Sequence, residues 1–243
     1  MANLSVLDRQ LLDLISSVPQ PATIQDVVTL MTNIDNLLPG DDGLKWFNKL
    51  YLKVTEAIDQ QAISGWADPA WLTQLDVIFA GLYFTAITEF LNDDPATASA
   101  WDALFESRYQ PNVERIQFAL AGMNAHINHD LALALVRTDT QMNRRATLQS
   151  PEHADYERVN GILAQLLPTV LTDLANGLLG GLAEDTGKVG RLLAIWNVAA
   201  ARDLAWTFAS YLQNIPQAAW PAALTVQDKI TGVAGRGLLL QLQ

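Results

Sequence analysis

Apolar residues recur every three or four positions along most of the chain, which is the spacing of one face of an α-helix. The first such stripe holds Leu4, Leu7, Leu11, Leu12 and Ile15. Proline, glycine and aspartate separate the stretches, and these residues favour helix ends and turns. The pattern predicts helices over 4–17, 23–38, 43–61, 69–91, 96–108, 112–138, 152–180, 186–213 and 220–242, with Thr23 as the cap of the second.

No stretch alternates apolar and polar residues as a half-buried strand does, and no hairpin turn separates β-rich runs. Pro168 interrupts the pattern of 152–180, and we expect a bend or break there because proline lacks an amide hydrogen. No linker is long or biased enough to divide the chain. The sequence therefore predicts an all-α fold, a single domain over 1–243 built as a bundle of about eight or nine helices.

Composition narrows the function classes. Half of the 243 residues are apolar and 17% are charged, which excludes a disordered chain. Fifteen Lys and Arg against 26 Asp and Glu leave a net charge of −11 with no basic run, so we expect no nucleic-acid partner. The absence of cysteine excludes disulfides, thiolate metal sites and a cysteine nucleophile. Neither a Gly-x-Ser-x-Gly motif nor a P-loop is present.

Targeting and membrane segments are not expected. The first twenty residues lack a basic start and resemble an amphipathic helix more than a signal peptide. The most apolar stretch, 161–183, falls short of the roughly 18 uninterrupted apolar residues of a membrane span. Its interruptions are Gln165, Pro168, Asp173 and Asn176. We therefore expect no transmembrane segment and a cytoplasmic protein.

Two of the three histidines lie together in the chain. His126 and His129 are three residues apart, and Asp130 follows His126 by four, so these side chains are neighbours on one helical face. They lie beside an apolar stripe that should face the core. Gly122 precedes His126 by one turn, and a glycine inside a helix costs about 1 kcal/mol relative to alanine. This glycine indicates close approach by another element or by a ligand.

Imidazole and carboxylate groups are ligands for zinc and for non-haem iron. His126, His129 and Asp130 could form part of such a site, which His153 or Asp155 would complete. Catalytic zinc typically takes three protein ligands and one water, whereas two histidines and one carboxylate suit iron(II). The predicted metal ligands are His126, His129, Asp130 and His153, with zinc or iron as the cofactor.

The same residues also fit a polar network without a metal. Asn124, Asn128 and Asp130 could satisfy the histidines by hydrogen bonds, and Asn124 lies four residues before Asn128. The spacing differs from the His-Glu-x-x-His motif of zinc proteases. The sequence leaves both interpretations open.

A charged pair, Arg202 and Asp203, lies inside an otherwise apolar helical pattern. Burying such charges is costly unless each has a partner. Arg202 could pair with Asp130 or Asp155, or bind an anionic substrate group with two hydrogen bonds. Asp203 could bind a metal or orient a histidine. The alternative is a surface turn of a mostly buried helix.

Further polar residues at helical spacing could line a pocket. Asp76 and Tyr83 lie two turns apart with Ala80 between them. Tyr51 and Thr55 lie four residues apart in another helix. Small-molecule sites often lie between the helices of a bundle, although tyrosines with satisfied hydroxyls are also common in cores. The predicted substrate-binding residues are Tyr51, Asp76, Tyr83, Asn124, Tyr156 and Trp206.

The run from Ala121 to Leu131, Ala-Gly-Met-Asn-Ala-His-Ile-Asn-His-Asp-Leu, resembles the signature of an uncharacterised bacterial family of all-helical domains of unknown function. The stretches 153–160 and 202–206 match the same pattern less specifically, and the resemblance covers about 45–210. It implies that these positions form one set, but it assigns no reaction.

These observations favour a metal-dependent enzyme, a hydrolase or an oxygenase, that acts on a small, largely apolar substrate inside the bundle. Its predicted catalytic residues are Asp155, Arg202 and Asp203. The alternative is a non-enzymatic protein that binds an apolar small molecule and uses the histidine, aspartate and arginine cluster as a polar network. A third hypothesis is an interaction module whose apolar surplus forms a homodimer interface.

Overall fold

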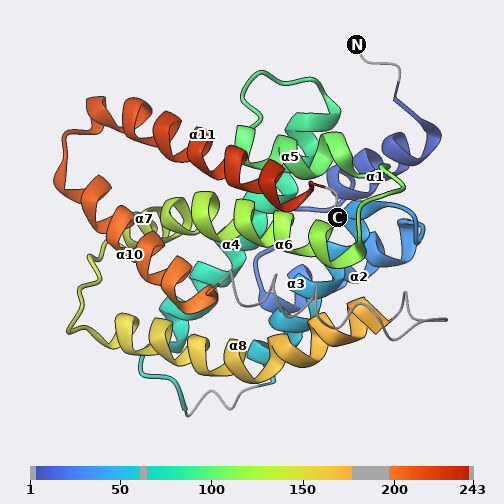
Figure 1. Ribbon diagram of the computed structural model, residues 1–243. Helices are drawn as coiled ribbons and strands as arrows, with labels where there is room; N and C mark the ends of the chain where they lie inside the picture. Colours follow the sequence, from blue (N-terminus) through green and yellow to red (C-terminus); the bar gives the residue numbers. More distant parts are fainter. Residues whose placement is uncertain (1–3, 61–64, 177–196, 241–243) are drawn as a thin grey trace.

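The computed structural model describes residues 4–60, 65–176 and 197–240 (Figure 1). Within these ranges every element is helical and no strand occurs, which confirms the predicted all-α fold. The helices are α1 (Val6–Ser16), α2 (Ile24–Leu37), α3 (Gly43–Asp59), α4 (Pro69–Leu91), α5 (Ser99–Ser107), α6 (Arg115–Ala125), α7 (Leu131–Gln141), α8 (Pro151–Asn176), α10 (Val198–Asn214) and α11 (Trp220–Leu238).

Two short elements complete the described part of the chain. A π-helical turn, His126–Asp130, joins α6 to α7, and a 3₁₀ turn, Gln217–Ala219, precedes α11. With α6, the π-helical turn and α7 counted as one rod, the described ranges contain nine helices. This number agrees with the sequence-based prediction.

The prediction for 152–180 needs a correction. Helix α8 does not break at Pro168 but continues through it to Asn176. Proline removes only one amide hydrogen from this 26-residue helix, and the regular backbone hydrogen bonds on both sides of Pro168 keep the helix continuous. The predicted end of this segment near 180 and the predicted start of the next at 186 lie outside the described residues.

Side-chain caps fix where several helices begin. Thr23 accepts a hydrogen bond from the amide of Asp26, and the Asp26 carboxylate accepts one from the amide of Thr23. This capping box confirms Thr23 as the predicted cap of α2. Asp42 and Asp68 cap α3 and α4 through their carboxylates. Capping hydrogen bonds therefore fix the first residues of these helices, whereas the apolar pattern gives only their approximate positions.

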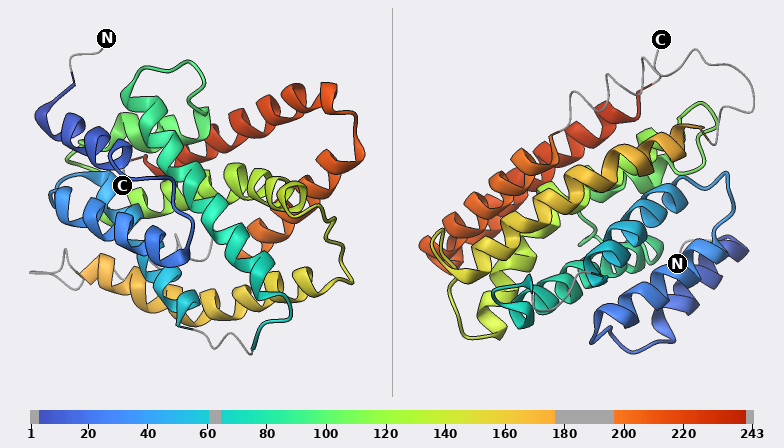
Figure 2. Two further views of the ribbon diagram at one scale, coloured as in Figure 1. Left: turned by 180° about the vertical axis from the view of Figure 1, so that it is seen from behind. Right: turned by 90° about the horizontal axis from the view of Figure 1, so that it is seen from below.

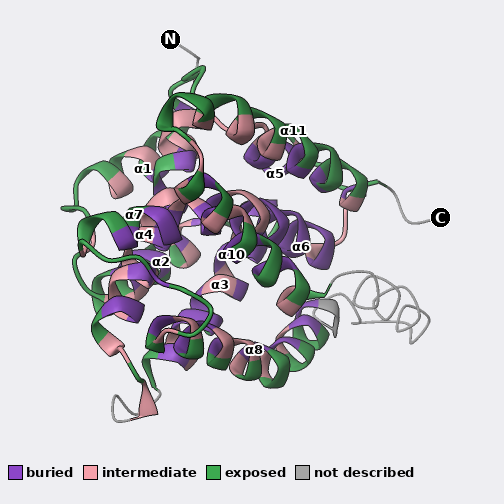
Figure 3. Cartoon of the chain, turned by 90° about the vertical axis from the view of Figure 1, so that its left-hand side faces the viewer, coloured by how far each residue is buried: buried purple, intermediate pink, exposed green. Residues whose placement is uncertain are grey.

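The core lies where α3, α4 and α6 meet. Figure 3 shows buried residues on the inward faces of the helices and exposed residues on their outward faces. Helix α3 packs against α2 and α6, and α4 packs against α7. At Gly122 of α6, a Cβ atom would lie 2.3 Å from the ring of Phe47 in α3. The predicted close approach is therefore confirmed, and the approaching element is α3.

The last helix covers another part of the bundle. In the right-hand view of Figure 2 the helices run side by side, with α1 and α2 on one side and α11 on the opposite side. Helix α11 packs on α5 and α6. A Cβ atom at Gly232 would lie 2.6 Å from the carbonyl oxygen of Ser99, so this contact requires glycine.

Helix α4 is long and apolar enough to cross a membrane by length and composition alone. Its apolar 18-residue window is 61% buried inside the protein, however. Because the core helix of a soluble protein passes the same test, this feature is weak evidence for a membrane. In the fold, α4 supplies one wall of the site described next.

Candidate functional site

The π-helical turn places His126, His129 and Asp130 at the centre of the protein. Its wider spacing is marked by the amide of Leu131, which donates to the carbonyl of His126 five residues earlier. Single π-turns inside α-helices are rare and often lie at functional sites. The local backbone therefore marks the region that the histidine spacing had indicated.

Asp130 binds both histidines of this turn and is only 3% exposed. Its Oδ2 atom lies 3.0 Å from Nδ1 of His126 and accepts the indole N–H of Trp101 at 3.0 Å. Its Oδ1 atom lies 2.7 Å from Nδ1 of His129. Burial would raise the pKa of Asp130, but the hydrogen bonds from both histidines outweigh it and hold that pKa below its usual value. The carboxylate is therefore ionised and only accepts, so both Nδ1 atoms carry the hydrogen.

This arrangement fixes the tautomer of His126. Because Nδ1 donates to Asp130, the neutral ring has its free lone pair on Nε2. His126 is 2% exposed, and Nε2 is buried without a hydrogen-bond partner among the described residues. Burial lowers the pKa of His126, and Asp130 opposes the shift only in part. The ring is therefore a neutral hydrogen-bond acceptor near neutral pH.

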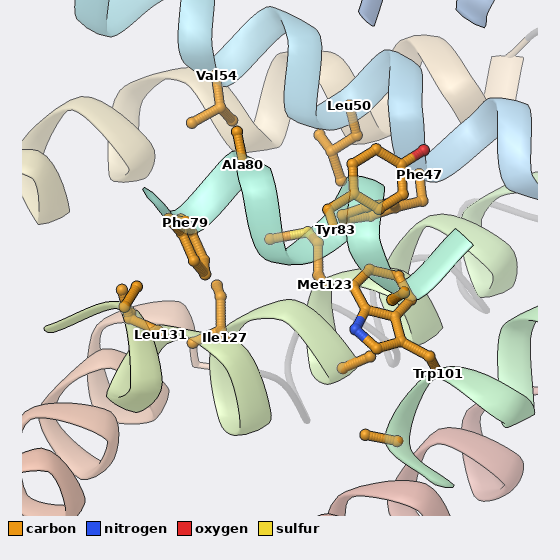
Figure 4. Close-up of a cluster of buried hydrophobic side chains, with 14 of the residues drawn as sticks. Phe47, Leu50, Val54, Phe79, Ala80, Tyr83, Trp101, Met123, Ile127 and Leu131 are labelled. Atoms are coloured by element: carbon orange, nitrogen blue, oxygen red, sulfur yellow. The ribbon is translucent and has the colours of Figure 1, made fainter. Parts of the chain in front are cut away.

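Aromatic rings hold the imidazole in place. The ring of Phe79 stacks face to face on His126, with centroids 3.5 Å apart and planes 4° from parallel. Tyr51 meets the same imidazole edge-on at 4.5 Å, and Phe47 lies 5.7 Å away. Figure 4 shows Phe79, Met123 and other apolar side chains of this cluster pointing toward one another. The direction of Nε2 is thus set by packing as well as by Asp130.

His126 lines a pocket of about 60 Å³ between α3, α4, the α6–α7 rod, α8 and α10. Twelve of its described lining residues are apolar. Its five polar lining residues are Tyr51, Thr55, Asp76, His126 and Arg202. The pocket is therefore an apolar space with a few polar groups, as in many small-molecule sites.

Asp76 supplies the second unpaired polar atom of this pocket. Its Oδ2 atom is buried and has no hydrogen-bond partner in the described part of the chain. Burial raises the pKa of Asp76 to about 7, the charge of Arg202 opposes the rise, and that of Asp59 adds to it. This carboxyl group therefore titrates close to neutral pH, where an ordinary aspartate is ionised.

Arg202 lines the pocket from α10, but its partners differ from those expected. Its Nε donates to Oδ1 of Asn160 at 2.6 Å, and its Nη2 donates to the carbonyl of Tyr156 at 2.8 Å. The guanidinium also lies over the Tyr156 ring, 4.0 Å from the centroid. The predicted pairing with Asp130 or Asp155 is wrong, because residues of α8 bind the guanidinium instead.

The predicted metal ligands do not gather into one group. His153 lies 3.5 Å from Glu157 and 4.6 Å from the ring of Trp206, and it does not line the pocket. Both oxygens of Asp130 face N–H donors. Within the described ranges, no group of three or more histidine, aspartate or glutamate side chains could hold a metal ion. His126, His129 and Asp130 of the π-turn and His153 of α8 therefore contact different residues and do not form a common metal site among the described residues.

Two predicted catalytic carboxylates have other surroundings. Asp155 accepts the backbone amides of Ala67 and Asp68 at 2.8 and 2.6 Å, so it holds the segment before α4. Asp203 is exposed on α10, which agrees with the surface alternative. Neither residue lines the pocket. The expected catalytic set of Asp155, Arg202 and Asp203 therefore places only Arg202 at the pocket.

Of the predicted substrate-binding residues, Tyr51 and Asp76 line the pocket, whereas four others do not. The hydroxyl of Tyr83 donates to Asn48 at 3.3 Å, as expected for a core tyrosine. Tyr156 donates its hydroxyl to the carbonyl of Arg202 at 2.6 Å. Their polar groups serve the fold.

Asn124 and Trp206 complete this comparison. Asn124 donates to the carbonyl of Thr231 and accepts from Asn128, which confirms the predicted proximity of the two asparagines. The indole nitrogen of Trp206 is buried without a partner among the described residues, away from the pocket lining. Neither residue contributes to the pocket wall.

His129 differs from His126 although both bind Asp130. Its Nε2 lies 3.9 Å from the carboxylate of Asp228, and it does not line the pocket. Burial would lower the pKa of His129, but Asp130, Asp228 and Glu89 together raise it. His129 therefore stays protonated to higher pH than a free histidine and neutralises carboxylates.

Sequence reasoning missed two residues that shape the site. Phe79 stacks on His126, and Trp101 donates to Asp130. Phe79 follows Asp76 by three residues, so its place on the same face of α4 could have been noted. Nothing in the local sequence around Trp101 indicates its partner.

These features define an all-α protein with a polar network beside an apolar pocket. The chain belongs to a family of unknown function, DUF5995, whose model matches residues 24–241. The membership confirms the resemblance to such a family noted from the sequence. Comparisons with curated proteins and with solved structures gave no match.

Proposed function

We propose that this protein binds a small, largely apolar molecule in the pocket and that a hydrogen-bond donor of this molecule bonds to Nε2 of His126. The observation that carries the proposal is that His126 lines the pocket and that its Nε2 atom is buried without a partner among the described residues. An unpaired buried polar atom costs about 1–3 kcal/mol. A hydroxyl or N–H group of a ligand would remove that cost.

The size of the pocket limits what enters it. A cavity of about 10–15 Å³ holds one water molecule, so 60 Å³ holds roughly four to six groups of that size. The twelve apolar lining residues favour hydrocarbon groups. The expected ligand, or the part of it inside the pocket, is therefore a short alkyl chain or small ring with one polar group.

The metal-dependent hydrolase or oxygenase expected from the sequence has less support than binding. Both oxygens of Asp130 accept hydrogen bonds from N–H donors, so they are not free to bind a metal. The imidazole of His126 and the carboxyl group of Asp76 are then the metal-binding groups among the described lining residues. Zinc or iron stays a prediction, which metal analysis of natively purified protein tests. About one equivalent of metal, lost in His126→Asn, would restore the metal-dependent enzyme. Cytoplasmic location and homodimer formation also stay predictions.

Two compounds of similar size test the binding proposal. Cyclopentanol and methylcyclopentane differ mainly in one hydroxyl group. We expect cyclopentanol to bind the full chain about 10-fold more tightly, which corresponds to roughly one buried hydrogen bond. Binding is measured by NMR from the methyl signals of Ile127, Leu131 and Leu163, which line the pocket.

The variant His126→Asn makes the test specific. The asparagine amide nitrogen can take the place of Nδ1 and donate to Asp130, whereas no atom replaces Nε2. The preference for the alcohol should therefore disappear in this variant. His153→Asn is the matched control, because His153 lies outside the pocket lining and should not affect binding. Equal binding of both compounds by the unmodified chain, or an unchanged preference in His126→Asn, would contradict the proposal.

A further inference from the structure

We propose that the same pocket catalyses the enolisation of small ketones. Nε2 of His126 removes a proton from the carbon next to the carbonyl, and the carboxyl group of Asp76 donates a proton to the carbonyl oxygen. This activity rests on the proposed function, because the ketone must first occupy the pocket, where its acidic C–H group takes the place of the hydrogen-bond donor at Nε2.

The two reacting groups lie on neighbouring parts of one pocket wall. Asp76 and Phe79 are three residues apart on α4 and so share a helical face. Phe79 in turn stacks on the imidazole of His126 at 3.5 Å. Both groups line the pocket, and Nε2 and Oδ2 are each buried without a hydrogen-bond partner among the described residues. Two residues from different elements, each with one unpaired buried polar atom, therefore line the same cavity.

Their environments make them a base and an acid. Because Asp130 holds the hydrogen on Nδ1, His126 presents an acceptor at Nε2. Burial raises the pKa of Asp76 to about 7. The positive charge of Arg202 opposes this rise, and the negative charge of Asp59 adds to it. Burial lowers the pKa of His126 against the effect of Asp130. Between the two pKa values the imidazole is free to accept and the carboxyl is free to donate, which is the pattern of paired acid and base catalysts.

The step balances without any other reactant. The C–H bond breaks and its proton moves to Nε2, while its electron pair forms the C=C bond. The π electrons of the carbonyl form an O–H bond with the proton of Asp76. The resulting imidazolium is stabilised by Asp130, and the Asp76 carboxylate lies in the field of Arg202. The Nε2 proton then exchanges with the solvent. In the reverse step the imidazolium returns this solvent hydrogen to the carbon, Asp76 regains its proton and the ketone forms again.

Deuterium exchange measures this reaction directly. The full chain is incubated with cyclopentanone in heavy water, and NMR follows the loss of the proton signal beside the carbonyl. We expect exchange above the buffer rate that falls about 100-fold in His126→Asn and in Asp76→Asn, the usual size of one general acid or base contribution. Asp35→Asn is the control for a carboxylate outside the pocket lining. Its Oδ1 atom is buried without a hydrogen bond in the described residues and pairs with Lys45 at 3.6 Å.

The outcomes separate this inference from the binding proposal. Cyclopentanone that shifts the pocket methyl signals without exchange above buffer overturns enolisation and leaves binding intact. Binding of cyclopentanol with no binding of cyclopentanone does the same. Absence of binding by both compounds overturns both proposals. Exchange that persists in both pocket variants also overturns the inference, whereas a rate that declines above pH about 7 in the unmodified chain but not in Asp76→Asn supports it.

Discussion

Asp130 and Asp139 lie nine residues apart on the α6–α7 rod, and both are buried, at 3% and 5% exposure. Each interacts with three nitrogen atoms, one of them a tryptophan indole N–H. Trp101 donates to Asp130 at 3.0 Å, and Trp71 donates to Asp139 at 2.9 Å. By residue type, burial and number of donors among the described residues the two carboxylates are alike.

The two carboxylates differ in their donors other than tryptophan. Asp139 accepts the amide of Ala146 and the side chain of Gln213, both at 2.9 Å, and neither donor continues toward a large cavity. The cavity beside Asp139 measures about 10 Å³, which is room for at most one water. Asp130 instead orients His126, which lines the pocket and whose second nitrogen has no partner among the described residues. A buried carboxylate thus has a structural role when its donor residues have no other polar atom at a cavity. It is a candidate functional group when one of its donor residues also lines a cavity and has a second, unpaired polar atom.

The largest expected effect comes from removing either charge. Asp130→Asn and Asp139→Asn each place an amide NH₂ among buried N–H donors, and each should reduce the free energy of unfolding by about 3 kcal/mol. Urea unfolding followed by circular dichroism measures the loss. Binding of cyclopentanol to the folded protein should weaken in Asp130→Asn alone, because only this change releases the tautomer of His126.

This pair of variants can also break the comparison. If Asp139→Asn abolishes binding as fully as Asp130→Asn does, the pocket depends on general stability and the two regions do not differ in role. Glu106→Gln is a control for the loss of a carboxylate charge at an exposed position, and it should change stability by less than about 0.5 kcal/mol.

The indole donors provide a smaller test. Trp101→Phe and Trp71→Phe each remove one hydrogen bond to a buried carboxylate, which should cost about 2 kcal/mol in the free energy of unfolding. Cyclopentanol binding should persist in Trp101→Phe, because His126 keeps its bond to Asp130. A loss of stability near zero in both variants would show that the indole bonds do not stabilise the carboxylates.

Gly122 and Asp76 illustrate what the sequence could predict of this site. The apolar period located the helices, and a glycine inside a periodic stretch indicated the close approach that Phe47 makes. Asp76 and Tyr51 were expected at a pocket because they are polar residues at helical spacing and small-molecule sites often lie between the helices of a bundle. These predictions needed only local spacing and the cost of burying polar groups.

His153 and Asp155 illustrate what could not be predicted. Their distance from the His126 region depends on which face α8 presents to α3 and α4, and periodicity alone does not fix that packing. Asp155 binds two amides of a loop whose conformation has no sequence period. The four-residue spacing correctly placed His126 beside Asp130. It did not predict the π-turn, or that His129 binds the carboxylate of the residue directly after it.

The third prediction concerns the outermost donor of the Asp139 region. Gln213 is partly exposed, and Asp139 keeps two other donors without it. Gln213→Ala should therefore reduce the free energy of unfolding by only about 1 kcal/mol. Cyclopentanol binding should stay unchanged, and weaker binding in this variant would show that the Asp139 region communicates with the pocket.

The smallest expected effect is a difference in titration between the two histidines on Asp130. Histidine NMR signals should show His129 titrating above 6.5 and His126 below it, because Asp130, Asp228 and Glu89 outweigh burial at His129 but burial dominates at His126. Since His129 has the raised pKa, the stability it contributes is complete below pH 6.5 and is lost as pH rises through its folded pKa. His126 has the lowered pKa, so its contribution is present above pH 6.5 and is lost as pH falls through its folded pKa.

Unfolding free energies of the unmodified chain and of His129→Gln, measured across this pH range, isolate the His129 contribution. The difference between the two proteins should shrink as pH rises, whereas Gln213→Ala should differ from the unmodified chain by the same amount at every pH, because the three donors of Asp139 carry no group that titrates there. A His129 midpoint below 6.5 would mean that its neighbouring carboxylates do not offset burial. The two histidines would then be equivalent, and the pocket-facing nitrogen of His126 would be distinguished by its position alone.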